Sequence, residues 1–343
     1  MKQAAIAAIE YHLPAETVTS ERLAAEFSGW SADKIDDKTG ISERHIAGEN
    51  ECASDLAVEA ARKLFAADAC QPAEIDYILF CTQSPDYFLP TTACTIQERL
   101  GIPQASGAID YNLGCSGFVT GLGLAKGLIE TGQASKVLLL TAETYSKFMN
   151  RRDKSVRTIF GDAGAATLVT AAEPAAEPYI GPLVYGTDGS GAGNLIVRTG
   201  GIREARTAES AVEHEEESGN FRSRDNLFMN GTEIFSFTLR VIPQCVKDLL
   251  ARAGITMEAV DLFVFHQANS FMLEHLRKRL KIPEEKFLIS MRSCGNTVSS
   301  TIPIALKNAR ETGKLKCGNR VMLVGFGVGY SWASALIRWP SAK

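Results

Sequence analysis

The stretch Ala73-Glu-Ile-Asp-Tyr-Ile-Leu-Phe-Cys-Thr-Gln-Ser84 returns in altered form as Glu258-Ala-Val-Asp-Leu-Phe-Val-Phe-His-Gln-Ala-Asn269, 185 positions later. A second pair of similar segments follows at nearly the same offset, at Lys136-Val-Leu-Leu-Leu140 and Arg320-Val-Met-Leu-Val324. Each copy contains an apolar run of four or five residues, which is typical of a strand buried on both faces. Two matches in the same order predict a fold built by duplication.

Helical patterns separate these strands. They cover residues 51–66, 116–131, 231–253 and 270–280, and the second is apolar on nearly every side, so it should be buried. Alternating strands and helices predict a parallel-rich α/β protein with helices on both faces of its sheets. The polar stretch 198–226, with five glutamates between Glu209 and Glu217, predicts a long surface excursion. It is either a solvated loop or a lid or partner surface.

The composition is that of a globular enzyme. The 343 residues carry a net charge of −4, with 45% hydrophobic and 22% charged residues, which excludes a mostly disordered chain and argues against a nucleic-acid-binding surface. No apolar run is long enough for a membrane span, and Glu10 interrupts the N-terminal apolar stretch too early for a signal peptide. We therefore expect a cytoplasmic protein whose eight cysteines are thiols, and their spacing indicates no metal site.

Cys115 is the candidate nucleophile. It lies between Gly114 and Gly117, where a strand over residues 108–111 turns sharply into the helix over 116–131. A helix N-terminus should lower the pKa of its thiol and supply N–H groups for an oxyanion. The alternative is a buried structural cysteine in a glycine-rich packing site.

Two polar residues in the second half are its candidate partners. His266 ends a buried strand, and Asn296 lies in a polar turn before another helix. Sites in α/β sheets assemble at the carboxyl ends of strands. The duplication should make the halves face each other, so that Cys115 can meet His266 and Asn296.

These residues, in this order, resemble the β-ketoacyl-acyl carrier protein synthase III family of thiolase-fold condensing enzymes. The resemblance covers nearly the whole chain and rests on six segments: 39–46, 114–118, 160–166, 266–269, 295–297 and 325–334. It implies a thiolase-like fold of two duplicated α/β halves in a layered αβαβα arrangement. The halves would be residues 1–175 and 176–343, with an insertion near 198–226, and the enzyme would be a homodimer.

The resemblance also implies a decarboxylating Claisen condensation of an acyl-CoA primer with malonyl-acyl carrier protein, with no metal or redox cofactor. Cys115 would carry the acyl group, while a neutral His266 and Asn296 would stabilise the enolate. The backbone N–H groups of Cys115 and Val328 would form the oxyanion hole. The family usually has glycine at the position of Val328.

Substrate contacts carried over from the family fall on Lys34, Lys154, Leu89, Asn269 and Phe160. Lys34 replaces a tryptophan that stacks on the CoA adenine, and Lys154 replaces an arginine on its other side. Leu89 replaces a phenylalanine that gates the acyl pocket. Together with the insertion near 198–226, these departures argue against acetyl-CoA as the primer. The resemblance implies fatty-acid or related secondary biosynthesis, and whether the role is housekeeping or secondary stays open.

Carrier-protein docking is expected on the helix that follows the histidine motif, at Gln267, Phe271, Arg277, Lys278 and Lys281. Phe271 replaces the family's docking arginine, but the basic cluster suits an acidic carrier protein.

Two other functions remain open. A relative of the same fold could move an acyl group to an oxygen or nitrogen acceptor without decarboxylation, in which case Asn296→Ala would spare activity. The chain could also be a non-catalytic partner in a heteromeric synthase. The chain length and branching of the primer, and whether CoA or a carrier protein delivers it, also stay open.

Overall fold

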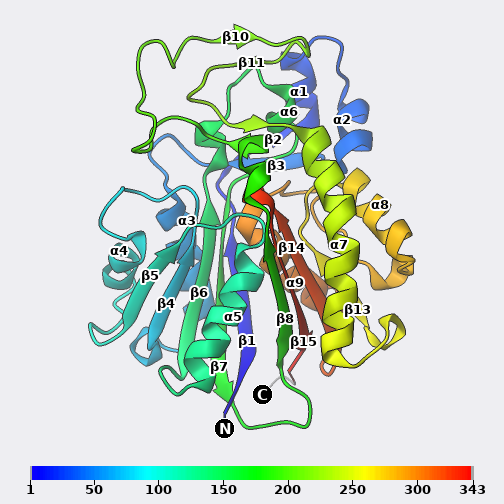
Figure 1. Ribbon diagram of the computed structural model, residues 1–343. Coiled ribbons are helices and arrows are strands. Elements are labelled where there is room, and N and C mark those ends of the chain that lie inside the picture. The colour runs from blue at the N-terminus through cyan, green and yellow to red at the C-terminus, as the bar shows by residue number, and fades with distance from the viewer. Residues whose placement is uncertain (1, 341–343) are drawn as a thin grey trace.

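Two mixed β-sheets form the centre of the structure, a computed structural model that describes residues 2–340 (Figure 1). The first sheet has the order β1-β7-β6-β4-β5, with the bounds Gln3–His12, Ala163–Ala172, Lys136–Glu143, Tyr77–Cys81 and Gly107–Tyr111. The second has the order β8-β15-β14-β13, with the bounds Ile180–Thr187, Ser331–Arg338, Arg320–Gly327 and Leu262–Phe265.

The two sheets share one pattern of strand pairing. β4 is parallel to β6, which is antiparallel to β7, and β13 is parallel to β14, which is antiparallel to β15. β1 and β8 are the antiparallel neighbours of β7 and β15. In the place of β5, the second sheet has a single parallel bridge between Phe263 and Phe287. The duplicated segments form β4 and β13 and begin β6 and β14, so the predicted duplicated α/β fold is confirmed.

Helices separate and cover the sheets, which gives five layers (Figure 1). The middle layer is α5 and α9, at Gly117–Glu130 and Thr301–Glu311, and both helices contact both sheets. On the outer faces lie α3 and α4 over the first sheet and α7 and α8 beside the second, at Ala53–Ala66, Thr92–Arg99, Gly231–Ala253 and Ser270–Leu280. The predictions over 231–253 and 270–280 match α7 and α8, and α3 and α5 begin slightly later than predicted.

Glycines let α5 fit between the sheets. A Cβ on Gly121 would lie 2.2 Å from the Tyr111 hydroxyl and 2.5 Å from Leu139 Cδ1, both in the first sheet. A Cβ on Gly123 would lie 1.9 Å from the hydroxyl of Tyr185 in the second sheet, but this tyrosine is 53% exposed and its side chain can move. Around Gly121 the interior is packed too densely to absorb such contacts, so this glycine sets the close approach of α5 to the first sheet. This explains the apolar character of the helix on nearly every side.

Several short elements lie at the upper end of the molecule in Figure 1, near the carboxyl ends of β4, β6, β13 and β14. The strands and helices there are β2, α1, α2, β3 and α6, at Glu16–Thr19, Ser20–Glu26, Ala32–Thr39, Glu43–Ile46 and Lys154–Arg157. Short 3₁₀ turns η1 to η7 occupy Pro72–Glu74, Tyr145–Phe148, Gly189–Asn194, Met257–Ala259, Glu284–Lys286, Val298–Ser300 and Val328–Tyr330.

The excursion predicted at 198–226 is folded onto this upper end. It contains the strand pair β10 with β11, at His214–Glu215 and Phe221–Arg222, and is flanked by the pair β9 with β12, at Leu195–Ile196 and Phe228–Met229. Arg222, whose side chain is 8% exposed, lies 3.2 Å from the fully buried carboxylate of Asp153 just before α6. Breaking a buried ion pair is costly, so this contact holds the β10–β11 hairpin over α6.

None of the helices within residues 2–340 is both long and apolar enough to span a bilayer.

Candidate active site

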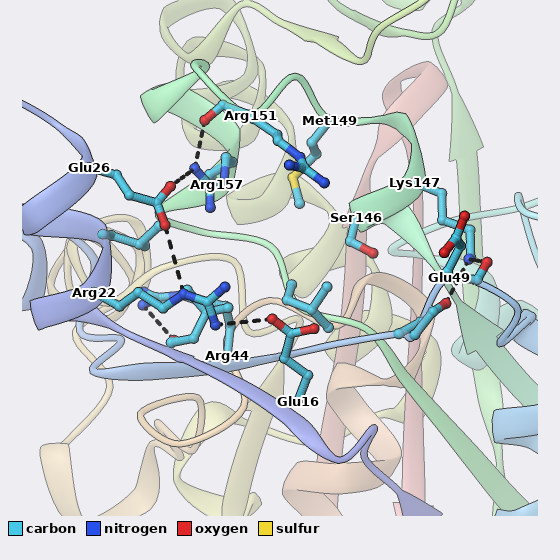
Figure 2. A pocket seen from close by; sticks show the side chains of 15 residues that line it. Glu16, Arg22, Glu26, Arg44, Glu49, Ser146, Lys147, Met149, Arg151 and Arg157 are labelled. Atoms are coloured by element: carbon cyan, nitrogen blue, oxygen red, sulfur yellow. Dashed lines mark hydrogen bonds and ion pairs between the residues drawn. The ribbon is translucent and has the colours of Figure 1, made fainter.

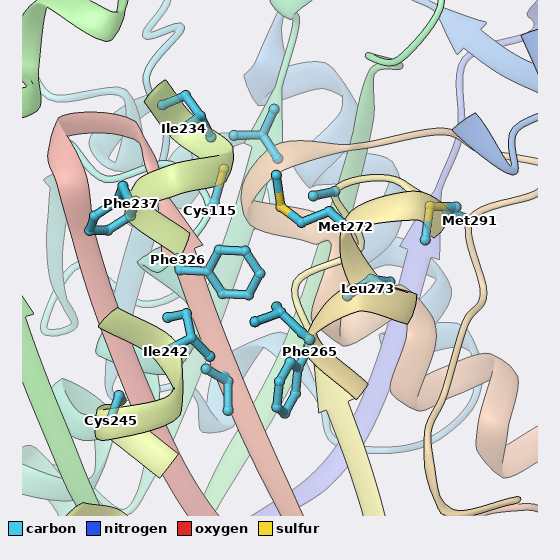
Figure 3. Close-up of a cluster of buried hydrophobic side chains, with 14 of the residues drawn as sticks. Cys115, Ile234, Phe237, Ile242, Cys245, Phe265, Met272, Leu273, Met291 and Phe326 are labelled. Atoms are coloured by element: carbon cyan, nitrogen blue, oxygen red, sulfur yellow. The ribbon is translucent and has the colours of Figure 1, made fainter. Parts of the chain in front are cut away.

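Cys115 lies in the turn between β5 and α5, at the upper end of the central helix. Its side chain is 5% exposed and belongs to an apolar cluster shared with Phe326 and Met272 (Figure 3). A Cβ on Gly327, at the end of β14, would lie 2.7 Å from the sulfur. Only glycine therefore allows this approach of the two halves at the nucleophile.

Burial raises the pKa of the Cys115 thiol to about 12, although the N–H of Val328 and its own N–H favour the thiolate. The expectation of a lowered pKa is wrong for the resting site, because desolvation outweighs the helix terminus. Val328 directly follows Gly327, which approaches the sulfur closely, so its N–H is a candidate oxyanion donor.

His266 follows β13 and is 2% exposed. Burial lowers the pKa of its ring to about 3, so the imidazole is neutral at physiological pH. Its Nδ1 lies 2.7 Å from the Thr301 hydroxyl oxygen, and that hydroxyl also lies 3.1 Å from the Val298 carbonyl oxygen. The hydroxyl has one proton, which it donates to the Val298 carbonyl in the resting site. Nε2 carries the ring proton and is a donor when the hydroxyl turns that proton to Nδ1 instead.

Asn296 is fixed from three sides. Its backbone N–H donates to the Ile159 carbonyl at 2.9 Å, and its carbonyl accepts from the Gly161 N–H at 3.0 Å. Its Oδ1 accepts from the Val298 N–H at 2.9 Å. Because Oδ1 is occupied as an acceptor, the amide presents Nδ2 as a donor.

Val298 connects these groups. It donates to Asn296, accepts from Thr301, and places Cγ1 3.2 Å from where a Cβ on Gly114 would stand. Its φ is 54°, a conformation that is a genuine outlier for a β-branched residue and costs roughly 1–3 kcal/mol. Strain of this kind persists only where the surroundings enforce it, and it is typical of functional sites.

A buried carboxyl group lies behind the nucleophile. Glu143, at the end of β6, accepts from the Gln83 N–H at 2.9 Å and from the hydroxyls of Ser84 and Ser299 at 3.2 and 3.0 Å. Burial raises its pKa to about 8, so it is mostly protonated at neutral pH and raises the pKa of Cys115 only when it is ionised. Glu143, Thr301 and Val298 were not predicted from the sequence. For Glu143 there was a signal, because this acidic residue closes the mostly apolar strand segment 137–142.

Comparison with known proteins identifies the arrangement. A family model described as 3-oxoacyl-[acyl-carrier-protein (ACP)] synthase III matches residues 109–189, and the model of its C-terminal part matches residues 250–339. The chain is 35% identical to beta-ketoacyl-[acyl-carrier-protein] synthase III of Caldanaerobacter subterraneus over 331 residues, which cover 96% of this chain and 95% of that one. The chain belongs to the 3-oxoacyl-[acyl-carrier-protein] synthase III family.

Solved structures agree with this assignment. A crystal structure of a 3-oxoacyl-(acyl-carrier-protein) synthase III is 56% identical, with a TM-score of 0.97 over 98% of this chain and all of that chain. A 3-oxoacyl-(acyl-carrier protein) synthase from Burkholderia xenovorans is 35% identical, with a TM-score of 0.89 over 99% and 95% of the two chains. The thiolase-like fold is therefore confirmed, and the chain is a condensing enzyme of the acyltransferase class (EC 2.3.1.-).

The residues expected at the substrate are not all brought to Cys115. Phe160 is buried against Tyr145 and forms a β-bridge with Asn296, so it supports the site. Asn269 caps α8, accepting from the Met272 N–H at 2.8 Å. Leu89 is 82% exposed on a surface loop and lies outside the cluster around Cys115.

The two lysines expected at the CoA adenine lie on the surface at the upper end. Lys34 is exposed on α2, with Nζ 3.0 Å from the Gly29 carbonyl and 5.0 Å from the centre of the Trp30 ring. Lys154 begins α6 below the β10–β11 hairpin, and its backbone N–H donates to Asn220 at 3.1 Å. The hairpin therefore covers one of the two expected adenine contacts.

The residues expected to dock the carrier protein differ in how exposed they are. Gln267 is 1% exposed, and its amide bonds the Phe265 carbonyl and the Ser290 N–H at 2.6 and 2.7 Å. Its expected contact with a carrier protein is therefore wrong, because no partner can reach it. Arg277 is held by Glu274 at 2.8 Å. Three of the residues remain exposed on α8 or just after it: Phe271, Lys278 and Lys281.

A cleft of about 900 Å³ lies away from these residues (Figure 2). It lies between the β2–β3 hairpin, α1 and the segment 146–151, and it does not include Cys115, His266 or Asn296. Arg22 and Arg157 are both paired with Glu26 there.

Within residues 2–340 no cluster of three or more histidine, cysteine or acidic side chains is placed to hold a metal.

Proposed function

We propose that the chain condenses an acyl-CoA primer with malonyl-acyl carrier protein through an acyl-Cys115 intermediate, with loss of CO₂. One observation carries the proposal. Gly327, the residue before Val328, approaches the Cys115 sulfur so closely that a Cβ there would lie 2.7 Å away. Val298, in the same buried cluster as Cys115, bonds both Asn296 and the Thr301 hydroxyl beside a neutral His266. This set can stabilise two different oxyanions in turn.

Acyl transfer comes first. The Cys115 sulfur attacks the thioester carbonyl, and the N–H groups of Cys115 and Val328 donate to the oxygen as it becomes negative. The C–S bond to CoA then breaks, and the leaving CoA sulfur takes up the proton that the thiol gives away. A thioester replaces a thioester, so no metal or redox cofactor is needed.

Decarboxylation follows at the other pair. His266 Nε2 and Asn296 Nδ2 donate to the malonyl thioester oxygen as loss of CO₂ turns it into an enolate. The carbon of the enolate attacks the acyl-Cys115 carbonyl, and the bond to sulfur breaks. Cys115 regains one proton from solvent, so each turnover consumes one proton and releases CO₂, CoA and a 3-oxoacyl carrier protein.

Intact-protein mass spectrometry tests the proposal. The wild type and Cys115→Ala are incubated with a panel of acyl-CoAs that differ in length and branching. We expect a mass gain of one acyl group in the wild type only, cleared by malonyl-acyl carrier protein. We also expect a primer other than acetyl to load best. Clearance by another acceptor without malonyl would contradict the condensation.

We propose that carrier protein docks at α8. Lys278 and Lys281 are exposed and have no carboxylate partner among the ion pairs of residues 2–340, so they can meet an acidic surface. Phe271 is 54% exposed and stacks near His275, with 4.2 Å between the ring centres. It offers an apolar contact where the family has a charge.

We also propose a homodimer. β5 is an edge strand of the first sheet, and its Ile109 is 41% exposed. The nearby loop exposes Tyr87, Phe88 and Leu89 at 65%, 81% and 82%. Unpaired edges and contiguous apolar surface favour association. Pairing of β5 with its copy would continue the sheet, and Leu89 could then contribute to the partner's acyl pocket.

The division of the chain into halves and its location in the cell belong to the same proposal. We propose halves at residues 1–175 and 176–343, which agrees with β7 and β8 belonging to different sheets. A cytoplasmic location is supported by the eight cysteines, all of which are free.

A further inference from the structure

Two valines close over the residue before the nucleophile. A Cβ on Gly114 would lie 2.5 Å from Gln83 Oε1, which accepts from the Tyr145 hydroxyl, and close to two valine methyl groups, Val328 Cγ1 at 2.6 Å and Val298 Cγ1 at 3.2 Å. Both come from the second half, whereas Gly114 and Cys115 come from the first. We call Val298 and Val328 the valine pair.

The backbone does not explain why a valine stands at position 298. Its N–H and carbonyl hold Asn296 and Thr301, and any residue would supply these two groups. Glycine or asparagine would adopt its φ of 54° at a lower cost. Because an unfavourable residue occupies the position, the branched side chain itself must contribute something.

The surroundings indicate what it contributes. Cys115 is 5% exposed and Val298 is fully buried, but Val298 is bonded to Asn296, whose amide N–H could hold a water. Water at this place would attack the acyl-Cys115 carbonyl carbon and break its bond to sulfur. Cys115 would take up a proton, and a free carboxylic acid would leave. Methyl groups offer water no hydrogen bond, so they keep the space dry.

We propose that the valine pair is a hydrophobic shield that keeps water from the acyl-Cys115 thioester and so commits the acyl group to condensation. The inference rests on the proposed function, since it needs the acyl-enzyme. The backbone of Val298 then positions Asn296 and Thr301. Its side chain determines whether acyl-Cys115 reacts by condensation or by hydrolysis.

The test measures how long the acyl-enzyme lasts. Wild type, Val298→Thr and Val328→Thr are loaded with the best acyl-CoA and freed of excess donor, and decay of the adduct is followed by intact mass. Threonine keeps the branched shape but adds a hydroxyl that can anchor water. We expect adduct decay about tenfold faster in both variants, with a higher ratio of free acid to 3-oxoacyl product when malonyl-acyl carrier protein is added.

Val246→Thr is the matched control, because Val246 is fully buried in the same apolar cluster but lies on α7. Its adduct should decay at the wild-type rate. Normal loading with unchanged decay in Val328→Thr, which is only half-buried and should fold, would overturn the shield. Equal acceleration in the control would overturn it too. Absence of any adduct in the wild type would instead overturn the proposed function.

Discussion

At the residue scale, Cys115 combines two opposing properties. It is a nucleophile, yet burial raises the pKa of its thiol to about 12. The resting site therefore holds a thiol rather than a thiolate. We infer that reactivity develops only when a thioester enters, since the oxyanion donors then stabilise charge on the substrate instead of on sulfur.

Alkylation of Cys115 in the free enzyme should reflect this pKa. Only the thiolate reacts, and its fraction below the pKa grows about tenfold per pH unit. The rate of modification by iodoacetamide, mapped to Cys115 by peptide mass spectrometry, should therefore rise without a plateau from about pH 7 to pH 10. A plateau below pH 8 would show that the thiol ionises in the resting site.

The sequence was informative about which residues react and uninformative about what surrounds them. Cys115, His266 and Asn296 lie in short motifs whose chemistry is readable locally. Gln267 and the Cys115 pKa were predicted wrongly because burial depends on segments far apart in the chain. Val298, Thr301 and Glu143 were missed for the same reason, since their roles arise only where the two halves meet.

At the element scale, α5 is the structural centre, because it carries Cys115 at its start and packs against both sheets. The contacts of Gly121 explain how a helix can occupy this narrow space. The strands and helices themselves could be predicted because apolar runs and helical periodicity are local signals. The small strands of the insertion could not, because its ordering depends on Arg222 reaching Asp153.

Gly121→Ala should lower the free energy of unfolding by about 1–3 kcal/mol, because the added methyl meets Tyr111 and Leu139 in a dense core. Gly127→Ala is the control on the same helix, since nothing lies within 4 Å of its Cβ position. It should be stabilising, by up to about 1 kcal/mol. Urea unfolding of both variants measures the difference, and equal effects would contradict the packing described for α5.

At the scale of the whole molecule, the duplication divides the chemistry. In the proposed mechanism, one half supplies the nucleophile, and the other supplies the enolate donors and the Val328 N–H. This mechanism therefore requires the two halves to be packed together. The exposed edge of the first sheet suggests that association of two copies completes the enzyme.

Ile109→Lys should disrupt that association, because a charge on each copy of the edge strand opposes pairing. With a chain mass of 37.1 kDa, light scattering after gel filtration should give twice this mass for the wild type and the single mass for the variant. Lys278→Glu, on the α8 surface, is the control and should stay associated. A wild type of single mass at micromolar concentration would contradict the proposed dimer.

The most direct test of the central claim is release of CO₂ from malonyl-acyl carrier protein by the acylated enzyme, compared between wild type and Asn296→Ala. Loss of the Nδ2 donor should slow CO₂ release by about 10²–10³-fold, while acyl-Cys115 still forms at the wild-type rate. An Asn296→Ala variant that keeps full turnover would contradict the account, because it would show transfer of the acyl group without an enolate.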